Sequence, residues 1–252
     1  ATAPRESRVA IASTGTTHLV AWESESHQIL GARFNADGTL IDSSAIEISS
    51  GPRPQSRPVI GTDGSRFLVV WSMDEPLGAC AGFCDTPLSL HAAVVTTSGF
   101  VTGPPIAIAP AYSRDAAVVW NGAEYAIFWE RHNHVEARRV DRHGNLRDAA
   151  PRAVTFPGGI LGATWNGREY LIGLAFRAPL AVGSVDRELR LIETVAVRSA
   201  YVPATPVVFF PRENHTALMA FQAIGEELVS RATGRLVGDD VNPPRRRAVS
   251  RR

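Results

Sequence analysis

Lysine is absent from this sequence of 252 residues, and all 26 basic side chains are arginine. With abundant alanine and proline, this bias points to a bacterial genome of high GC content and says nothing about function. No apolar run approaches the roughly 20 residues that span a bilayer, so we expect no transmembrane segment. The G-x-S-x-G, H-E-x-x-H and phosphate-loop motifs are also missing, so the common marks of serine hydrolases, zinc proteases and nucleotide-binding enzymes are lacking.

Charge gives no reason to expect a nucleic-acid partner. The net charge is +1, and five arginines lie in the last eight residues, so the rest of the chain carries 1 − 5 = −4. We expect residues 245–252 to form a disordered arginine-rich tail. The alternative for this tail is salt-sensitive docking to an anionic partner.

A repeated segment organises the chain. Its clearest copy is Thr62–Trp71, a tight turn followed by an apolar strand that ends on tryptophan. The strand-ending residues are 49, 58, 45 and 47 positions apart, which is the period of a propeller repeat. The other copies are Ser13–Trp22, Trp120–Trp129, Trp165–Leu174 and a degraded one at Arg212–Phe221.

A second turn, usually centred on glycine, follows each copy, so each unit divides into four strands. We expect the Asn-Gly and Asp-Gly turns to be two-residue hairpins in which both residues take positive φ. The predicted fold is all-β, a five-bladed β-propeller with four antiparallel strands per blade. It occupies residues 1–244 as a single domain, with blades at about 7–55, 56–113, 114–158, 159–202 and 203–244.

The repeat resembles propeller repeats of secreted bacterial proteins, in which an LVVW-like strand precedes two glycine-marked turns. The resemblance covers nearly the whole chain. The repeats lack the Gly-His and Trp-Asp of WD repeats, the paired glycines of kelch repeats and the calcium-binding loops of integrin-type repeats. The resemblance to these repeats implies a secreted protein that is extracellular, periplasmic or on the cell surface.

Both cysteines lie in an insertion of the second unit, residues 72–89. Cys80 and Cys84 are predicted to form a local disulfide that shapes an exposed loop, which also favours an oxidising compartment. A metal or redox role is the alternative. Two thiols with Asp85 and no nearby histidine fall short of a zinc site, and the spacing is not C-x-x-C.

One face of such a propeller would collect the candidate ligand-binding residues. Arginines at the entries of the inner strands would form a partial positive ring suited to a carboxylate or phosphate, although solvated or salt-bridged arginines are the plain alternative. His132 and His134 could instead ligate a metal, but a solvated loop is the expected reading, so we predict no metal and no cofactor. The full predicted set is Arg8, Arg57, Arg114, Glu23, Glu130, His132 and His134.

The tryptophans divide into two groups. Trp22, Trp71 and Trp129 end strands that are apolar on both faces, and we expect them in the core. Trp120 and Trp165 flank the Asn-Gly turns, where packing on neighbouring tyrosines is favoured over exposed sugar-stacking platforms.

Function is the least determined property. We expect a non-catalytic binding or protein-interaction module whose partner is a protein or a glycan, with possible assembly into a larger complex. A carbohydrate-binding lectin is the first alternative, although the repeats share no column of polar residues. A glycoside hydrolase-like enzyme is the second, although the inner strands hold a single acid, Asp115, where paired carboxylates are needed.

Overall fold

A computed structural model of the chain describes residues 9–76, 87–175, 181–196, 208–212, 216–223 and 226–233. Every regular element in these ranges is a β-strand, as predicted. A search of this described part found no helix that is long and apolar enough to cross a membrane.

The strands form five antiparallel sheets, named here first to fifth, and in each sheet the strands are ordered as in the chain. The first sheet contains β1 (Val9–Ser13), β2 (Thr17–Glu23), β3 (Ile29–Asn35) and β4 (Ile46–Ser49). The second contains β5 (Gln55–Thr62), β6 (Arg66–Asp74), β7 (Leu88–Thr96) and β8 (Val101–Ala109). The third contains β9 (Ser113–Trp120), β10 (Tyr125–Arg131), β11 (His134–Val140) and β12 (Arg152–Pro157).

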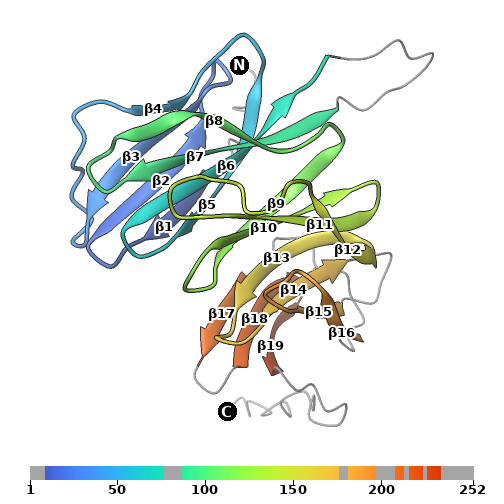
Figure 1. Cartoon of the computed structure of the whole chain (residues 1–252). Coiled ribbons are helices and arrows are strands. Elements are labelled where there is room, and N and C mark those ends of the chain that lie inside the picture. The colour runs from blue at the N-terminus through green and yellow to red at the C-terminus, as the bar shows by residue number, and fades with distance from the viewer. Residues whose placement is uncertain are drawn as a thin grey trace, which may run out of the picture.

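The fourth sheet contains β13 (Gly159–Trp165), β14 (Tyr170–Ala175), β15 (Ala181–Val185) and β16 (Leu191–Ala196). The fifth has three described strands, β17 (Val208–Arg212), β18 (Thr216–Ala223) and β19 (Glu226–Thr233). The predicted four-stranded unit is therefore confirmed in the first four sheets. The inner strands contact one another in series, from β1 to β5, β9, β13 and β17, and Figure 1 shows the sheets following one another in this order.

Apolar side chains fill the space between successive sheets among the first four, because the middle strands there are apolar on both faces. We call the face toward the preceding sheet the backward face and the opposite one the forward face. In the second sheet, Phe67, Val69 and Trp71 form the backward face and are fully buried against the first sheet. Tyr125, Ile127 and Trp129 repeat the arrangement in the third sheet.

Trp22 differs from the other strand-ending tryptophans. Trp71 and Trp129 are 0% exposed and confirm the predicted core position, whereas Trp22 is only partly buried. Its strand belongs to the first sheet, whose backward face has no preceding sheet along the chain. The prediction that Trp22 lies in the core therefore fails in this structure.

The predicted packing of Trp120 and Trp165 is confirmed. Their rings lie 4.8 Å from those of Tyr125 and Tyr170 respectively, and an arginine covers each indole. These two tryptophans are part of repeated aromatic clusters at the turns, so they are not free sugar platforms.

The turns that open the middle strands are longer than the predicted two-residue hairpins. Asn121 Oδ1 accepts hydrogen bonds of 2.9 Å from the N–H groups of Ala123 and Glu124, and only Gly122 takes a left-handed conformation, with φ 94°. Asp63 caps Ser65 and Arg66 in the same way. The prediction was wrong because the Asx side chain supplies a second acceptor, which closes a loop needing one positive φ and not two.

An arginine tie links successive sheets and was not apparent from the sequence. Arg33 in β3 binds the Asp42 carboxylate, and its Nη1 donates to the carbonyl of Thr97 in the second sheet at 2.6 Å. Arg139 makes the same link from Asp148 to the carbonyl of Arg187. Because the Arg33 and Asp42 side chains are only 13% and 11% exposed, solvent screens this pair weakly.

Gly61 marks a close approach between the neighbouring inner strands β5 and β9. A Cβ atom at Gly61 would lie 2.5 Å from Val118 Cγ1, so Gly61→Ala should overpack the junction and lower the unfolding free energy by about 1–3 kcal/mol. Chemical denaturation measures this loss. Val118→Ala removes the clashing atoms, so the double variant should be more stable than the sum of the two single losses predicts. Strictly additive losses would contradict the close approach.

The Arg33–Asp42 tie should make stability depend on pH. The hydrogen bond from Arg33 holds the pKa of Asp42 below its ordinary value, so its contribution is present above about pH 4 and is lost as the pH falls through the lowered pKa. Asp42→Asn should cost about 1–2 kcal/mol at pH 7 and progressively less toward pH 2, as measured by urea unfolding. Glu47→Gln, at an exposed position, is the matched control and should cost little at any pH. A cost for Asp42→Asn that is independent of pH would refute this explanation.

Candidate ligand-binding site

Two β-bulges shape the candidate site. Ser56 pairs with Ser72 and Val59 with Val70, so two residues, Arg57 and Pro58, lie opposite the single residue Trp71. The extra residue turns the strand and leaves Arg57 in a left-handed conformation, with φ 54°.

The same bulge recurs in the third sheet. Arg114 pairs with Glu130 and Ala117 with Phe128, which leaves Asp115 and its neighbour opposite Trp129. Asp115 has φ 49° and is thus the structural equivalent of Arg57. Arg57 and Asp115 each lie 14 positions before the strand-ending tryptophan of their unit (71 − 57 and 129 − 115), so Asp115 and not Arg114 is the counterpart of Arg57.

The two bulge residues meet across the junction between sheets. Arg57 Nη1 lies 3.5 Å from Asp115 Oδ1, and both side chains are more than one-third exposed. Arg114 Nε lies 3.8 Å from Glu130 Oε1. Both separations are longer than a close charged hydrogen bond of about 2.8 Å. Each guanidinium has five N–H donors, so its carboxylate partner leaves some of them available to a ligand.

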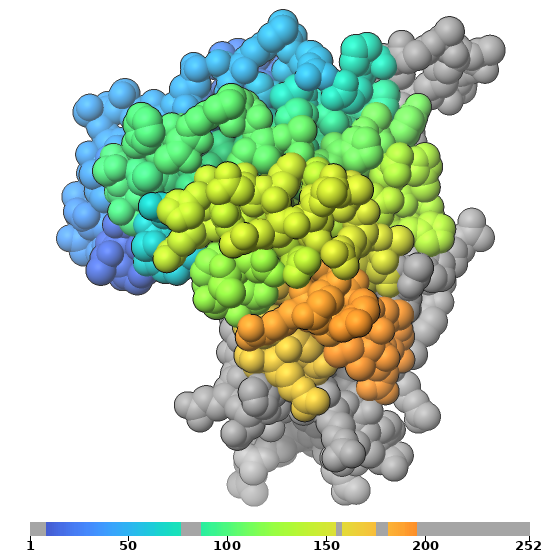
Figure 2. Space-filling view, viewed as in Figure 1, coloured from blue at the N-terminus to red at the C-terminus, as the bar shows by residue number. Residues whose placement is uncertain are grey.

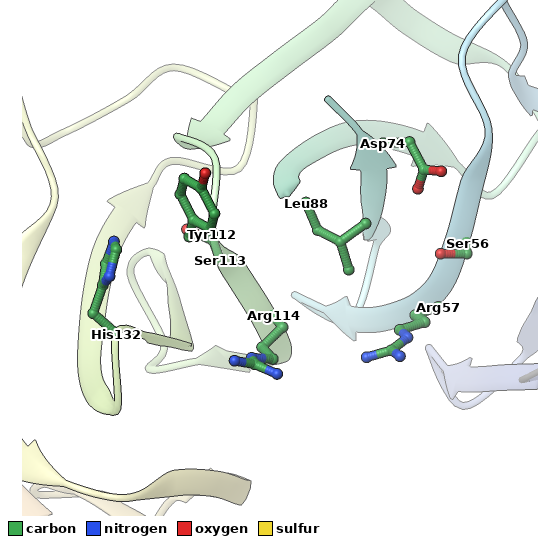
Figure 3. Close-up of a pocket in the computed structure, with 8 residues that line it drawn as sticks. All are labelled: Ser56, Arg57, Asp74, Leu88, Tyr112, Ser113, Arg114 and His132. Atoms are coloured by element: carbon green, nitrogen blue, oxygen red, sulfur yellow. The ribbon is translucent and has the colours of Figure 1, made fainter. Parts of the chain in front are cut away.

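A pocket of about 400 Å³ opens beside these arginines. Figure 3 shows the Arg57 and Arg114 guanidinium groups on one side of it, with Asp74 well away from them and Tyr112 near His132. The volume suits a small polar molecule or one end of a glycan. The lining residues are Ser56, Arg57, Asp74, Leu88, Tyr112, Ser113, Arg114 and His132.

A tight hairpin between β10 and β11 brings His132 to the pocket. Its two loop residues, His132 and Asn133, have φ 48° and 64°, and Arg131 pairs with His134 across it. The His132 ring lies 5.4 Å from the Tyr112 ring, and Tyr112 is 55% exposed with φ 69°. The pocket therefore has an accessible aromatic edge beside its cationic groups.

The structure brings together three members of the predicted set, Arg57, Arg114 and His132. Glu130 is adjacent, through its ion pair with Arg114. The predicted ligand-binding set did not include Tyr112, Leu88, Asp74, Ser56 or Ser113. Tyr112 was missed because no repeated feature of the sequence marks its position.

The other predicted residues lie elsewhere or cannot be placed. Glu23 pairs with His27 at 2.7 Å in the first sheet, and His134 contacts the carbonyl oxygen of His132 without lining the pocket. Arg8, Cys80 and Cys84 lie outside the described residues. No group of three or more metal-binding side chains was found in the described part of the chain.

A partly buried polar chain lies at the end of β6 and start of β7. The Ser89 hydroxyl contacts Glu75 Oε1 at 2.6 Å and His91 Nε2 at 3.1 Å, and Arg53 holds Glu75. Burial lowers the pKa of His91, as does nearby Arg53. With its single proton donated to Glu75, Ser89 must accept from His91, so the imidazole cannot activate this buried hydroxyl as a nucleophile.

The comparisons with known proteins identify the fold. No protein-family model and no curated protein sequence matches the chain. Its structure is similar to a GH43_1 enzyme from Xanthomonas citri, with TM-score 0.55, 11% identity and coverage of 94% of this chain and 93% of the enzyme. It is also similar to the Dos1 propeller, with TM-score 0.50, 11% identity and coverage of 89% and 67%.

A prolyl endopeptidase gives TM-score 0.54 at 16% identity, covering 89% of this chain, which spans 32% of that peptidase. At these identities the likeness is to the fold alone. The four-stranded sheets together with these neighbours show a β-propeller fold.

The left-handed backbone at Arg57 can be separated from its charge by two substitutions. Arg57→Gly and Arg57→Ala both remove the guanidinium, but only glycine adopts φ 54° without strain. The glycine variant should be more stable than the alanine variant by about 1 kcal/mol, as measured by thermal or urea unfolding. At Val59, which does not have a positive φ, the order should be reversed, and Val59→Gly should be less stable than Val59→Ala. The reverse order at position 57 would show that the bulge stores no strain.

Proposed function

We propose that this protein is a non-catalytic binding module that holds a small anionic ligand in the pocket between its second and third sheets. The observation that carries the proposal is a concentration of backbone strain. Seven described non-glycine residues have positive φ, and five of them line or adjoin this pocket: Arg57, Tyr112, Asp115, His132 and Asn133. Strain of this kind costs about 1–3 kcal/mol per residue and tends to persist at functional sites.

The pocket chemistry indicates the ligand class. Arg57 and Arg114 present guanidinium donors that their distant carboxylate partners leave available, which suits a carboxylate or phosphate. The exposed ring of Tyr112 offers an apolar surface beside the cations, and the Ser56 hydroxyl adds a polar contact. The ligand would thus be a small molecule or glycan end that carries an anionic group.

We further propose that the module is a five-bladed ring and that it is exported from the cell. Five sheets in series favour a five-bladed propeller as the complete ring. The cysteine pair in the insertion of the second sheet favours an exported protein, at the cell surface or beyond it.

A glycoside hydrolase is the second candidate, favoured by the similarity over nearly the full length to GH43_1 enzymes, one of which was crystallised with xylotriose. Such chemistry needs two carboxylates flanking the scissile bond. Asp74 is the one carboxylate lining the described pocket, and nearby Asp115 and Glu130 are each paired with an arginine. The geometry therefore supports binding better than hydrolysis.

Calorimetric titration with glucuronic acid, inorganic phosphate and xylotriose tests both candidates. We expect binding of at least one of the two anions, weakening as salt is raised because the guanidinium attraction is screened. Arg57→Gln and Arg114→Gln should each weaken it about tenfold or more, since a charged hydrogen bond contributes about 1.5–3 kcal/mol.

Arg190→Gln is the matched control, because it removes the same charge from a 72% exposed side chain in the fourth sheet. If Arg190→Gln weakened anion binding as much as the pocket substitutions do, the effect would reflect the overall charge of the protein and not the two pocket arginines. Release of xylose from xylotriose, abolished by Asp74→Asn, would replace the binding proposal with the hydrolase. Binding of neither anion would reject the proposed ligand class.

A further inference from the structure

The segment that carries Tyr112 to the pocket is held in a strained conformation. It joins β8 of the second sheet to β9 of the third, and Figure 2 shows these two sheets packed against each other. Tyr112 has φ 69°, and its ring is 55% exposed and lies 5.4 Å from the His132 ring. A bulky residue keeps a left-handed backbone at an exposed position only where contacts around it fix the chain.

Two side chains of the third sheet supply such contacts. The hydroxyl of the buried Ser113 donates to the Pro110 carbonyl at 2.8 Å, which closes the turn from within. Arg131 Nε donates to the Ala111 carbonyl at 3.3 Å. Arg131 also pairs with Ser113 in the ladder and directly precedes His132 in the chain, so it connects the two segments that meet at the aromatic edge of the pocket.

A carboxylate anchors the Arg131 guanidinium. Arg131 Nη1 donates to Glu136 Oε1 at 3.3 Å, and the two side chains are 31% and 19% exposed. Within the described part of the chain, the buried Glu136 Oε2 has no hydrogen-bond partner. Arg131 therefore offsets the cost of burying this carboxylate, and Glu136 holds the guanidinium beside the Ala111 carbonyl. Neither Arg131 nor Glu136 lines the pocket itself.

We propose that Arg131, held by Glu136, is a positioning residue that keeps Tyr112 at the edge of the pocket and thereby sets the selectivity of the pocket. This inference rests on the proposed anion site. Arg57 and Arg114 attract any small anion, whereas the Tyr112 ring adds contact area only for a ligand that has a ring-shaped body. The pocket should therefore favour an anion that carries a sugar or another ring over a bare oxyanion, and this preference should depend on Arg131.

Calorimetric titration of the full chain with glucuronic acid and with inorganic phosphate measures this preference. The main variant combines Arg131→Gln with Glu136→Gln, because removing both charges keeps the net charge constant and leaves no buried carboxylate without its partner. We expect glucuronic acid to bind this variant about two- to tenfold more weakly, the range of one aromatic contact, and phosphate affinity to change by less than about twofold. Equal weakening of both anions would overturn the proposal.

Tyr112→Ala shows whether Arg131 acts through the aromatic ring. It should weaken glucuronic acid binding by a similar factor, and adding the Arg131→Gln and Glu136→Gln pair to it should have little further effect, because the ring contact is already lost. Losses that multiply in the combined variant would contradict this coupling. If the paired variant does not fold, Arg131→Lys replaces it, since lysine keeps a charge beside Glu136 but lacks the fork that also reaches Ala111, and the same selective loss is expected.

Arg138→Gln is the matched control. Arg138 also links the third sheet to β8, because its guanidinium donates to the carbonyl oxygens of Ala107 and Ile108. Its other hydrogen bonds in the described part of the chain go to Asp148 and Ala149, and none goes to residues 110–113. This variant should leave the ratio of the two affinities unchanged. A fall in the ratio as large as that of the main variant would mean that any loosened link between the sheets has this effect.

The contact between the Tyr112 and His132 rings can be measured in the absence of ligand. In protein labelled on tyrosine and histidine, nuclear Overhauser spectra should show this contact, and it should be lost in the Arg131→Gln, Glu136→Gln variant but persist in Arg138→Gln. A contact that survives in the paired variant would refute the positioning role of Arg131. Because this measurement does not depend on anion binding, it still judges that role if the proposed anion site fails.

Discussion

The burial of one sheet face against the next is the interaction on which the rest of the structure depends. Each middle strand is apolar on both sides, so a single sheet cannot hide its own residues and must be covered by two neighbours. The fully buried Phe67, Val69 and Trp71 show how closely the second sheet meets the first. Because the same contact recurs at the three junctions among the first four sheets, the position of each of these sheets is set by the one before it.

This stacking also explains where the molecule can hold a ligand. The inner strands β5 and β9 approach closely at Gly61 and Val118, and the described pocket opens where these two strands begin. The bulges opposite Trp71 and Trp129 lie at this end of the strands, where Arg57 and Asp115 come within 3.5 Å of each other. The tight core and the pocket therefore lie along the same junction between sheets. The strained backbone, with positive φ at Arg57 and Asp115, is found at the pocket.

The candidate site, and with it the function proposed for it, follows from asymmetry and not from the repeat. The four-stranded units share their cores and turns, whereas Tyr112, Arg114 and His132 occur together at one junction. A single site of this kind suits a module that recognises one ligand. The fold itself does not decide between binding and catalysis, because propellers with similar structures include enzymes, and only the side chains at the pocket bear on that choice.

Much of the architecture was determined by the sequence alone. The period of the LVVW-like strands and the alternation of turns predicted four-stranded antiparallel units and the burial of Trp71 and Trp129, because apolar patterning encodes which face each residue occupies. The turn lengths were mispredicted, since the capping by Asp63 and Asn121 depends on side-chain geometry that spacing does not report.

Only the tertiary structure decided the candidate site. The same bulge occurs in β5 and β9 and lies where Arg57 and Asp115 meet across the junction, and the repeat pattern does not report that a bulge is present. The partly exposed Trp22 likewise reflects its place at the end of the series and not its own sequence, which matches the buried copies. Local patterning sets which residues are apolar and which strands pair, whereas burial and proximity depend on what lies across the junction.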